Sequence, residues 1–421
     1  MQIVMGLVGM VVLLSIAVLF SSDRRAIKLR TVGGALLLQM TIPAIVLLTP
    51  WGASALKSVT NGVQAVIDSA NSGISFLFGP IVSDKMFQLF DGNGFIFALK
   101  VLPVIIFFAS LMSVLYHLKI MQIVIKVFGG GLQKMLGTSR TESMSAAANI
   151  FVGQTEAPLV VKPYIKTMTS SELFAIMAGG LASVAGAVLA GYASMGVSLN
   201  YLIAASFMAA PGGLLMAKIL VPETETPDET LEKKIEDEQD DEEQAANVLD
   251  AAAIGASSGL QLALNVGAML LAFIALISLL NMIIGGIGGI FGYGEITMQM
   301  ILGYLFAPIA YILGIPWTEA IQAGSLLGQK LVINEFVAYV DFIANKEVFS
   351  AHSQAIISVA LCGFANLSSI AILLGGLGVL APSRRKEIAR FGLKAVLAGT
   401  LSNFMSATLV GIFMALSGQA M

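Results

Sequence analysis

The sequence is short of charged residues. Only 12% of its 421 residues are Asp, Glu, Lys or Arg, against about 25% in soluble domains. Hydrophobic residues make up 57%, and the mean hydropathy is +0.87. A soluble protein of this composition lacks the polar side chains needed to cover its surface, whereas a bilayer solvates apolar side chains directly. The composition therefore excludes an ordinary soluble domain and predicts a lipid-embedded protein.

Cysteine, histidine and nucleotide-binding loops are also scarce. The single cysteine, Cys362, excludes an intramolecular disulfide. The two histidines, His117 and His352, argue against a His/Cys metal cluster. No Gly-rich loop ends in Lys-Ser or Lys-Thr, which argues against an ATP-driven pump. Neither an organic cofactor nor a nucleic-acid partner is expected.

What the sequence has in abundance is long apolar runs. They lie at 3–21, 31–49, 94–117, 172–195, 200–221, 252–283, 353–379 and 391–416. These runs predict eight membrane crossings. Basic residues cluster at 24–30 and at 384–390, and both clusters fall on the same side in this count. Because basic loops stay inside, both termini are expected outside.

Two further segments do not read as crossings. In 119–134, basic residues interrupt an apolar face, which predicts an amphipathic helix lying in the membrane interface. In 223–243, twelve acidic residues stand against two lysines, which gives the segment a charge of −10. Such a charge run is typical of a solvated connector.

Two segments are apolar at their arms and polar at their centres. The first, 141–168, has Gly-Gln-Thr-Glu at 153–156, and the second, 316–347, has Asn334-Glu335. Each arm is too short to cross, so we expect two re-entrant hairpins, buried in protein or lining a wet cavity. An unpaired carboxylate in hydrocarbon costs about 3 kcal/mol or more, so each glutamate at a tip needs water, a partner or a substrate.

Each hairpin precedes an apolar run that is interrupted by polar or small residues. The interruptions lie at 178–186 and 363–369. The order hairpin, broken helix, helix thus occurs twice, at 141–221 and 316–416. An odd number of crossings separates the two copies, which predicts inverted repeats. Paired interrupted segments of this kind mark the binding site of secondary transporters.

The polar residues at these centres indicate the chemistry of the solute. They are Gln154, Thr155, Glu156, Asn334, Glu335, Asn366 and Ser369. An anionic substrate normally needs Arg or Lys, and neither lies at these centres. Carboxylates, amides and hydroxyls instead suit a neutral solute rich in O–H and N–H groups. We therefore expect a secondary transporter of a small hydroxylated solute.

Three strings give the sequence a family resemblance. Residues 153–158 (GQTEAP), 334–338 (NEFVA) and 362–369 (CGFANLSS) resemble the signatures of the concentrative nucleoside transporter family, bacterial sodium-coupled type. The similarity runs over nearly the whole chain. It implies an all-α polytopic membrane protein with eight transmembrane helices, two re-entrant hairpins in inverted repeats and an interfacial amphipathic helix. It also implies a homotrimer in the bacterial inner membrane, with a scaffold part and a moving transport part.

The resemblance also implies a role for individual residues. The residues expected to contact the nucleobase are Gln154, Thr155 and Glu156, with apolar contacts from Val188 and Leu262. The residues expected around the ribose are Glu335, Phe364, Asn366 and Ser369. The expected sodium ligands are the side chains of Asn149 and Ser183 and the carbonyls of Val152 and Val184. Sodium prefers oxygen donors, and broken helices supply carbonyls. The Asn149 amide also favours Na⁺ over H⁺ as coupling ion, because proton-coupled relatives tend to lack it.

The expected function is sodium-coupled symport of nucleosides into the cell by alternating access. A proton-coupled nucleoside symporter is the alternative, with Glu156 or Glu335 as proton carrier. A gated channel is a further alternative. An intramembrane enzyme would use the same two acids for acid/base chemistry. However, no nucleophile–His pair accompanies them, so no enzyme is expected.

The expected parts of the chain follow from these segments. They are N-terminal helices with a connector (1–93), a scaffold helix with the interfacial helix (94–140), the first hairpin repeat (141–222), an acidic cytoplasmic linker (223–249), a scaffold helix with an external helix (250–315), and the second hairpin repeat (316–421).

Overall fold

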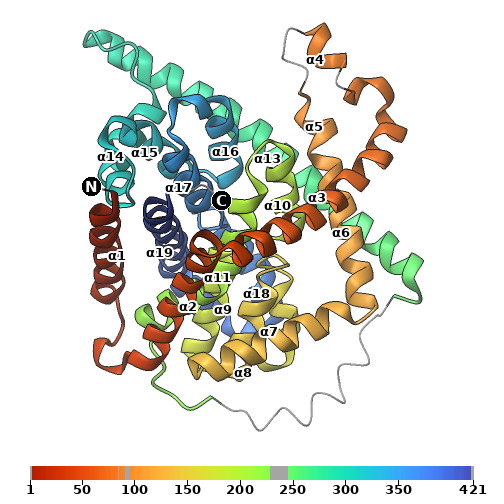
Figure 1. Cartoon of the computed structure of the whole chain (residues 1–421), viewed down its shortest axis with the longest axis vertical. Coiled ribbons are helices and arrows are strands. Elements are labelled where there is room, and N and C mark those ends of the chain that lie inside the picture. Colours follow the sequence, from red (N-terminus) through yellow and green to blue (C-terminus); the bar gives the residue numbers. More distant parts are fainter. Residues whose placement is uncertain (1, 84, 91–94, 228–244, 419–421) are drawn as a thin grey trace.

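The structure is a computed structural model of the chain, and it describes residues 2–83, 85–90, 95–227 and 245–418 (Figure 1). The regular structure of these residues is helical throughout. The predicted acidic linker lies mostly outside the described residues. The N-terminal half contains α1 (Gln2–Leu19), α2 (Leu29–Leu48), α3 (Pro50–Phe78), α4 (Lys85–Leu89), α5 (Phe97–Lys100), α6 (Leu102–His117), α7 (Ile120–Leu136), α8 (Arg140–Ala148), α9 (Ser170–Ala182), α10 (Gly186–Ser194) and α11 (Leu199–Leu220).

The C-terminal half begins with the longest helix. Its elements are α13 (Val248–Ile290), α14 (Met298–Ile312), α15 (Trp317–Val332), α16 (Glu335–Ala344), α17 (Ala351–Leu361), α18 (Ser369–Leu380) and α19 (Arg385–Ser417). Short 3₁₀ turns join several of these helices, and the one at Ala157–Tyr164 (η3) forms the second arm of the first hairpin.

Eight helices of the described chain are long and apolar enough to cross a membrane. Seven of them match predicted runs. The run predicted at 353–379 is present as α17 and α18, each too short to cross alone, which confirms the predicted break. The helix predicted over 119–134 is also confirmed, as α7.

The eighth long helix corrects the sequence analysis. Residues 50–78 were assigned to a connector, but they form α3, which runs obliquely to α1 in Figure 1. Polar residues spaced along this segment keep it from reading as an apolar run. Its buried positions Ile67, Ala70 and Ile74 nevertheless follow helical spacing. Pro50 at the first helical position and Thr49 as N-cap start the helix where the sequence signals it.

The two predicted repeats form the core of the molecule. The first contains α8, η3, α9, α10 and α11, and the second contains α15 to α19. Most side chains of α9, α10, α11, α17 and α19 are buried. By contrast, α13 buries few of its residues and packs along α6. The two repeats are therefore the most buried part of the described chain, and α13 is among its most exposed helices.

α19 passes between the two broken helices at close range. A methyl group on Gly399 would lie 2.9 Å from Cβ of Leu181, just before the first break, and 3.0 Å from Cβ of Ala365, within the second. Only a residue without a side chain fits here. This contact fixes the distance between the two repeats.

Replacing Gly399 by Ala therefore should overpack the joint between the repeats. We expect a loss of about 1–3 kcal/mol of stability, seen as a lower midpoint of thermal unfolding in detergent. The matched control is Gly375→Ala on α18, where an added methyl group has no neighbour within 4 Å. Equal midpoints for the two variants would contradict the expectation.

Candidate functional site

The first hairpin is built by strong local signals. Ser139 and Glu142 form a capping box that starts α8, and the helix ends at Ala148. Residues 149–156 are not helical, and the second arm is the 3₁₀ turn η3. Two prolines explain the 3₁₀ arm, because proline lacks the N–H that an α-helix needs. The hairpin tip thus consists of irregular backbone inside the protein.

Two tip residues bury polar groups without partners. Asn149 is 1% exposed, and both of its side-chain polar atoms lack a hydrogen bond. Gln154 is 5% exposed, and its Oε1 also lacks one. Both side chains lie against the last turns of α9, where Gly179 and Gly180 leave room for them. A buried polar atom without a partner is costly, so these atoms indicate a place prepared for a ligand.

The predicted break in the first broken helix lies beside this tip. α9 ends at Ala182, Ser183 is extended, and α10 starts at Gly186. Gly186 N–H donates to the carbonyl of Phe151 in the tip, at 2.9 Å. Ser183 is 1% exposed, and its hydroxyl donates to the Gly180 carbonyl at 3.3 Å.

The four predicted sodium ligands all belong to the first hairpin tip and the adjoining helix break. Asn149 and Ser183 both lie at the last turn of α9, and Val152 and Val184 are buried in the tip and in the break. All four can offer neutral oxygens, the donors that suit a hard monovalent cation. The donor set fits sodium.

The second hairpin carries a carboxylate that is tightly held. Asn334 caps α16 by accepting from Val337 N–H at 2.9 Å. Glu335, 4% exposed, accepts from the Tyr192 hydroxyl at 2.9 Å and from the Asn366 amide at 3.0 Å. The two bonds engage different carboxylate oxygens, which leaves acceptor capacity on each for a ligand.

The second break is organised by Asn366. Its Oδ1 accepts from Ser369 N–H at 2.9 Å and from the Ser368 hydroxyl at 2.7 Å. Phe364 N–H donates to the Ser183 carbonyl at 3.1 Å, which joins the two broken helices. Glu335, Asn366 and Ser369 thus form one hydrogen-bonded cluster, and Phe364 lies in the same break.

Tyr192 is a site residue that the sequence analysis missed. It is fully buried on α10, and its ring packs on those of Phe336 and Tyr339 at centroid distances of 4.7 and 4.6 Å. Its hydroxyl reaches Glu335 across the two repeats. A tyrosine inside an apolar run gives no sequence signal of such a partner, because the contact joins residues 143 positions apart.

The remaining predicted residues occupy mixed environments. Thr155 packs on Gly376 of α18, and the Glu156 side chain is exposed beside Gly153. Val188 is buried on α10, and Leu262 is half-buried on α13. The exposed Glu156 differs from the expectation of a membrane-depth acid in need of a partner, because its side chain lies at the surface of the described chain.

A buried positive charge lies near the second tip, outside its polar centre. The sequence analysis found no Lys at the hairpin centres, yet Lys330 is buried at 1% exposure, five residues before Glu335. Its position in the last turn of α15 sends the side chain into the core. No sequence pattern predicted this burial, because a lysine at the end of a hairpin arm is usually solvated.

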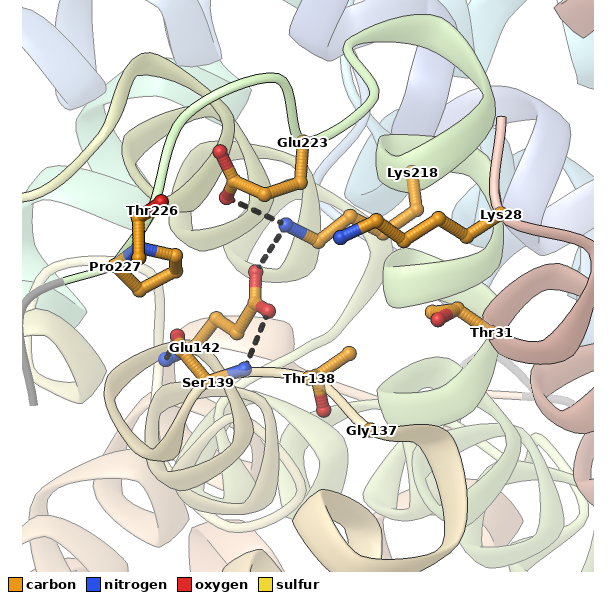
Figure 2. A pocket seen from close by; sticks show the side chains of 10 residues that line it. All are labelled: Lys28, Thr31, Gly137, Thr138, Ser139, Glu142, Lys218, Glu223, Thr226 and Pro227. Carbon is orange, nitrogen blue, oxygen red and sulfur yellow. Dashed lines mark hydrogen bonds and ion pairs between the residues drawn. The ribbon is translucent and has the colours of Figure 1, made fainter. Parts of the chain in front are cut away.

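A separate cavity of about 640 Å³ lies at the foot of the first hairpin (Figure 2). There the Lys218 ammonium lies between two carboxylates, 2.6 Å from Glu142 and 3.5 Å from Glu223. None of the predicted substrate or ion residues lines this cavity. We attribute the ion pairs to fastening α8 against α11.

Comparison with known families agrees with this geometry. Residues 201–411 match the C-terminal model of the Na⁺ dependent nucleoside transporters, and residues 8–81 match the N-terminal model. Residues 98–199 match a nucleoside recognition model. An uncharacterized transporter of Haemophilus influenzae is 57% identical over the full length of both chains. The nucleoside permease NupC of Helicobacter pylori is 52% identical over 98% of each chain.

Solved structures agree as well. The structure of CNTnw in an inward-facing substrate-bound state superposes with a TM-score of 0.95 at 59% identity and covers both chains fully. A CNTnw variant in an outward-facing state gives a TM-score of 0.94 at 58% identity, again with full coverage of both chains. These relatives are transporters, not enzymes. The chain therefore belongs to the concentrative, Na⁺-dependent nucleoside transporter family.

Proposed function

We propose that the chain imports nucleosides together with sodium by alternating access. The observation that carries the proposal is the convergence of both hairpin tips and both helix breaks. Glu335, fixed by partners from both repeats, stands on one side, and the unpartnered polar atoms of Asn149 and Gln154 stand on the other. Such a pair of broken segments is how secondary transporters hold solute and ion together.

The nucleoside is held by the two tips in different ways. Glu335 accepts bonds from the ribose hydroxyls, and Asn366 and Ser369 complete that contact. The Phe364 ring lines the ribose. On the other side, Gln154, Thr155 and Glu156 pair with the polar edge of the base. Val188 and Leu262 supply apolar contacts to the base.

Sodium is the proposed coupling ion. Asn149, Ser183 and the carbonyls of Val152 and Val184 would hold it, and the buried amide of Asn149 gains a partner when it arrives. Because Asn149 and Gln154 lie on the same tip, ion binding orders the residues that meet the base. The sodium dependence named for the family supports this choice.

The loaded repeats then move as a unit. In our proposal, 141–222 and 316–421 form the transport part, and 94–140 with 250–315 form the scaffold. The existence of inward- and outward-facing forms of CNTnw supports such a cycle. The proton-coupled alternative remains a distinct hypothesis, favoured by Glu156, a carboxylate that is exposed at the first tip.

The membrane setting completes the proposal. We infer a multi-pass protein of the bacterial inner membrane with both termini outside, assembled as a homotrimer. The broad exposed apolar surface of α13 supports contact with lipid or with another copy of the chain.

Replacing Glu335 by Gln removes the charge that strengthens the ribose bonds. Charged hydrogen bonds contribute about 1.5–3 kcal/mol, so uridine uptake (kcat/KM) into proteoliposomes should fall about 10- to 100-fold. The matched control is Glu347→Gln, whose side chain is exposed in the turn after α16. Unchanged uptake by the Glu335 variant would remove it from the site.

Replacing Asn149 by Ala removes a sodium ligand but no base contact. We expect the half-saturating sodium concentration for uridine uptake to rise by about tenfold or more, equivalent to about 1.4 kcal/mol. The control is Asn265→Ala on the exposed side of α13. Wild-type uptake that follows an imposed pH gradient and ignores sodium would contradict sodium coupling and support the proton alternative.

Replacing Tyr192 by Phe keeps the packed ring and removes one donor to Glu335. We expect KM for uridine to rise about 3- to 10-fold, since a buried hydrogen bond to a charged group is lost, while the sodium dependence stays unchanged. Equal KM values in variant and wild type would show that Tyr192 does not position the carboxylate.

A further inference from the structure

One amide in the interior holds both helix breaks. α9 ends at Ala182 and α17 at Leu361, and helix ends leave carbonyls without intrahelical partners. The Nδ2 group of Asn403 on α19 donates to the Ala182 carbonyl at 2.6 Å and to the Cys362 carbonyl at 3.0 Å. A side chain on Gly363 would overlap this amide, so a glycine is needed at position 363 to leave room for the Asn403 side chain.

A buried ammonium completes the joint. Lys330 Nζ donates to Asn403 Oδ1 at 2.7 Å and to the Ala360 carbonyl in the last turn of α17 at 2.6 Å. These partners also fix the orientation of the amide, because the ammonium only donates and the two carbonyls only accept. None of the ion pairs found in the described parts of the chain includes Lys330.

Carbonyl and amide oxygens therefore balance the charge of Lys330 at short range, and the Glu335 carboxylate acts on it at longer range. A buried ammonium without a carboxylate contact is costly unless oxygens surround it. The carbonyl end of a helix is its negative pole, and α17 directs that end at Nζ. The oxygens around Nζ are of the kind that a free monovalent cation would take.

The two repeats resemble each other at the carbonyl ends of their broken helices, α9 and α17. In the first, Asn149, whose polar atoms have no partner, and Ser183 lie at the last turn of α9, where we place the sodium ion. In the second, the Lys330 ammonium lies at the last turn of α17. Each broken helix thus has a place for one positive charge at its carbonyl end.

We propose that Lys330 is a tethered cation that takes the place of a second sodium ion and, through Asn403, positions both broken helices for nucleoside binding. The inference rests on the proposed sodium symport. It follows that one sodium ion accompanies each nucleoside, because the second cation position is filled by the chain itself.

The test compares two variants of the full-length protein in proteoliposomes. Lys330→Ala empties the cation position, and Lys330→Met fills it without charge. For the wild type we expect a Hill coefficient for sodium of about 1. For the alanine variant we expect about 2, or recovery of uptake by n-propylammonium, which replaces the missing part of the side chain. In the methionine variant, uridine uptake should fall by about tenfold or more, and n-propylammonium should not restore it.

Two results would overturn the proposal. One is wild-type uptake in both variants. The other is equal loss in both, with a sodium Hill coefficient that stays at about 1 and no response to propylammonium. The matched control is Lys394→Ala, which should behave as wild type. Lys394 is a half-buried lysine on α19, and its Nζ lies 3.5 Å from the Leu220 carbonyl.

Asn403→Asp keeps the proposal testable if the lysine variants do not fold. Aspartate retains the acceptor for Lys330 but loses both donors to Ala182 and Cys362. We expect a folded protein with nucleoside affinity reduced about tenfold, measured by equilibrium binding without a gradient. Unchanged affinity would overturn the positioning role.

The failure of the proposed function gives a different result. If wild-type uptake does not depend on sodium, the proposed sodium coupling is wrong, and the Hill coefficient for sodium no longer tests the role of Lys330. Propylammonium recovery of Lys330→Ala and the affinity of Asn403→Asp then still decide the role of Lys330.

Discussion

Backbone groups that are freed by a helix break inside a membrane must find partners within the protein, because lipid offers none. This molecule has two such breaks, after Ala182 and after Leu361, and two irregular hairpin tips beside them. Asn403 holds both helix ends, Gly186 N–H holds the first tip, and Leu367 N–H donates to the Leu331 carbonyl near the second tip. The architecture of the repeats follows from meeting these requirements.

The two hairpin tips differ in how many of their buried polar atoms have hydrogen-bond partners. Glu335 and Asn366 have hydrogen-bond partners in Tyr192, Ser368 and Ser369, so the second tip is bonded without a ligand. Asn149 and Gln154 on the first tip bury polar atoms that have no hydrogen-bond partner within the described chain. One tip is preorganised, and the other gains its missing bonds on binding. This asymmetry suits a carrier, since ligand binding can then decide when the repeats are ready to move.

Close packing between the repeats gives the site its precision. Small residues let α19 approach both breaks, at Gly399 and at Gly363, and the approach places Asn403 between them. Membrane helices gain little from hydrophobic burial against each other, so such close contacts and interhelical hydrogen bonds carry the association. A change at these glycines therefore acts on the site without touching it.

Much of the fold was predictable because its signals are local. Apolar runs predicted the long helices, the polar centres predicted both hairpins, and polar interruptions predicted both breaks, all of which the structure confirms. The helix at 50–78 was missed, because its polar residues hide a buried stripe that repeats at helical spacing.

The sequence by itself determined the membrane class, the repeats, their breaks and the residue types at the site, because these depend on composition and short-range order. The tertiary structure alone decided that Tyr192 meets Glu335, that Asn149 stays without a partner, and that Lys330 reaches Asn403 in the core. The two contacts join residues up to 143 positions apart, and the Asn149 amide has no partner in the described chain. They depend on how closely the two repeats pack around α19, a distance that no local pattern encodes.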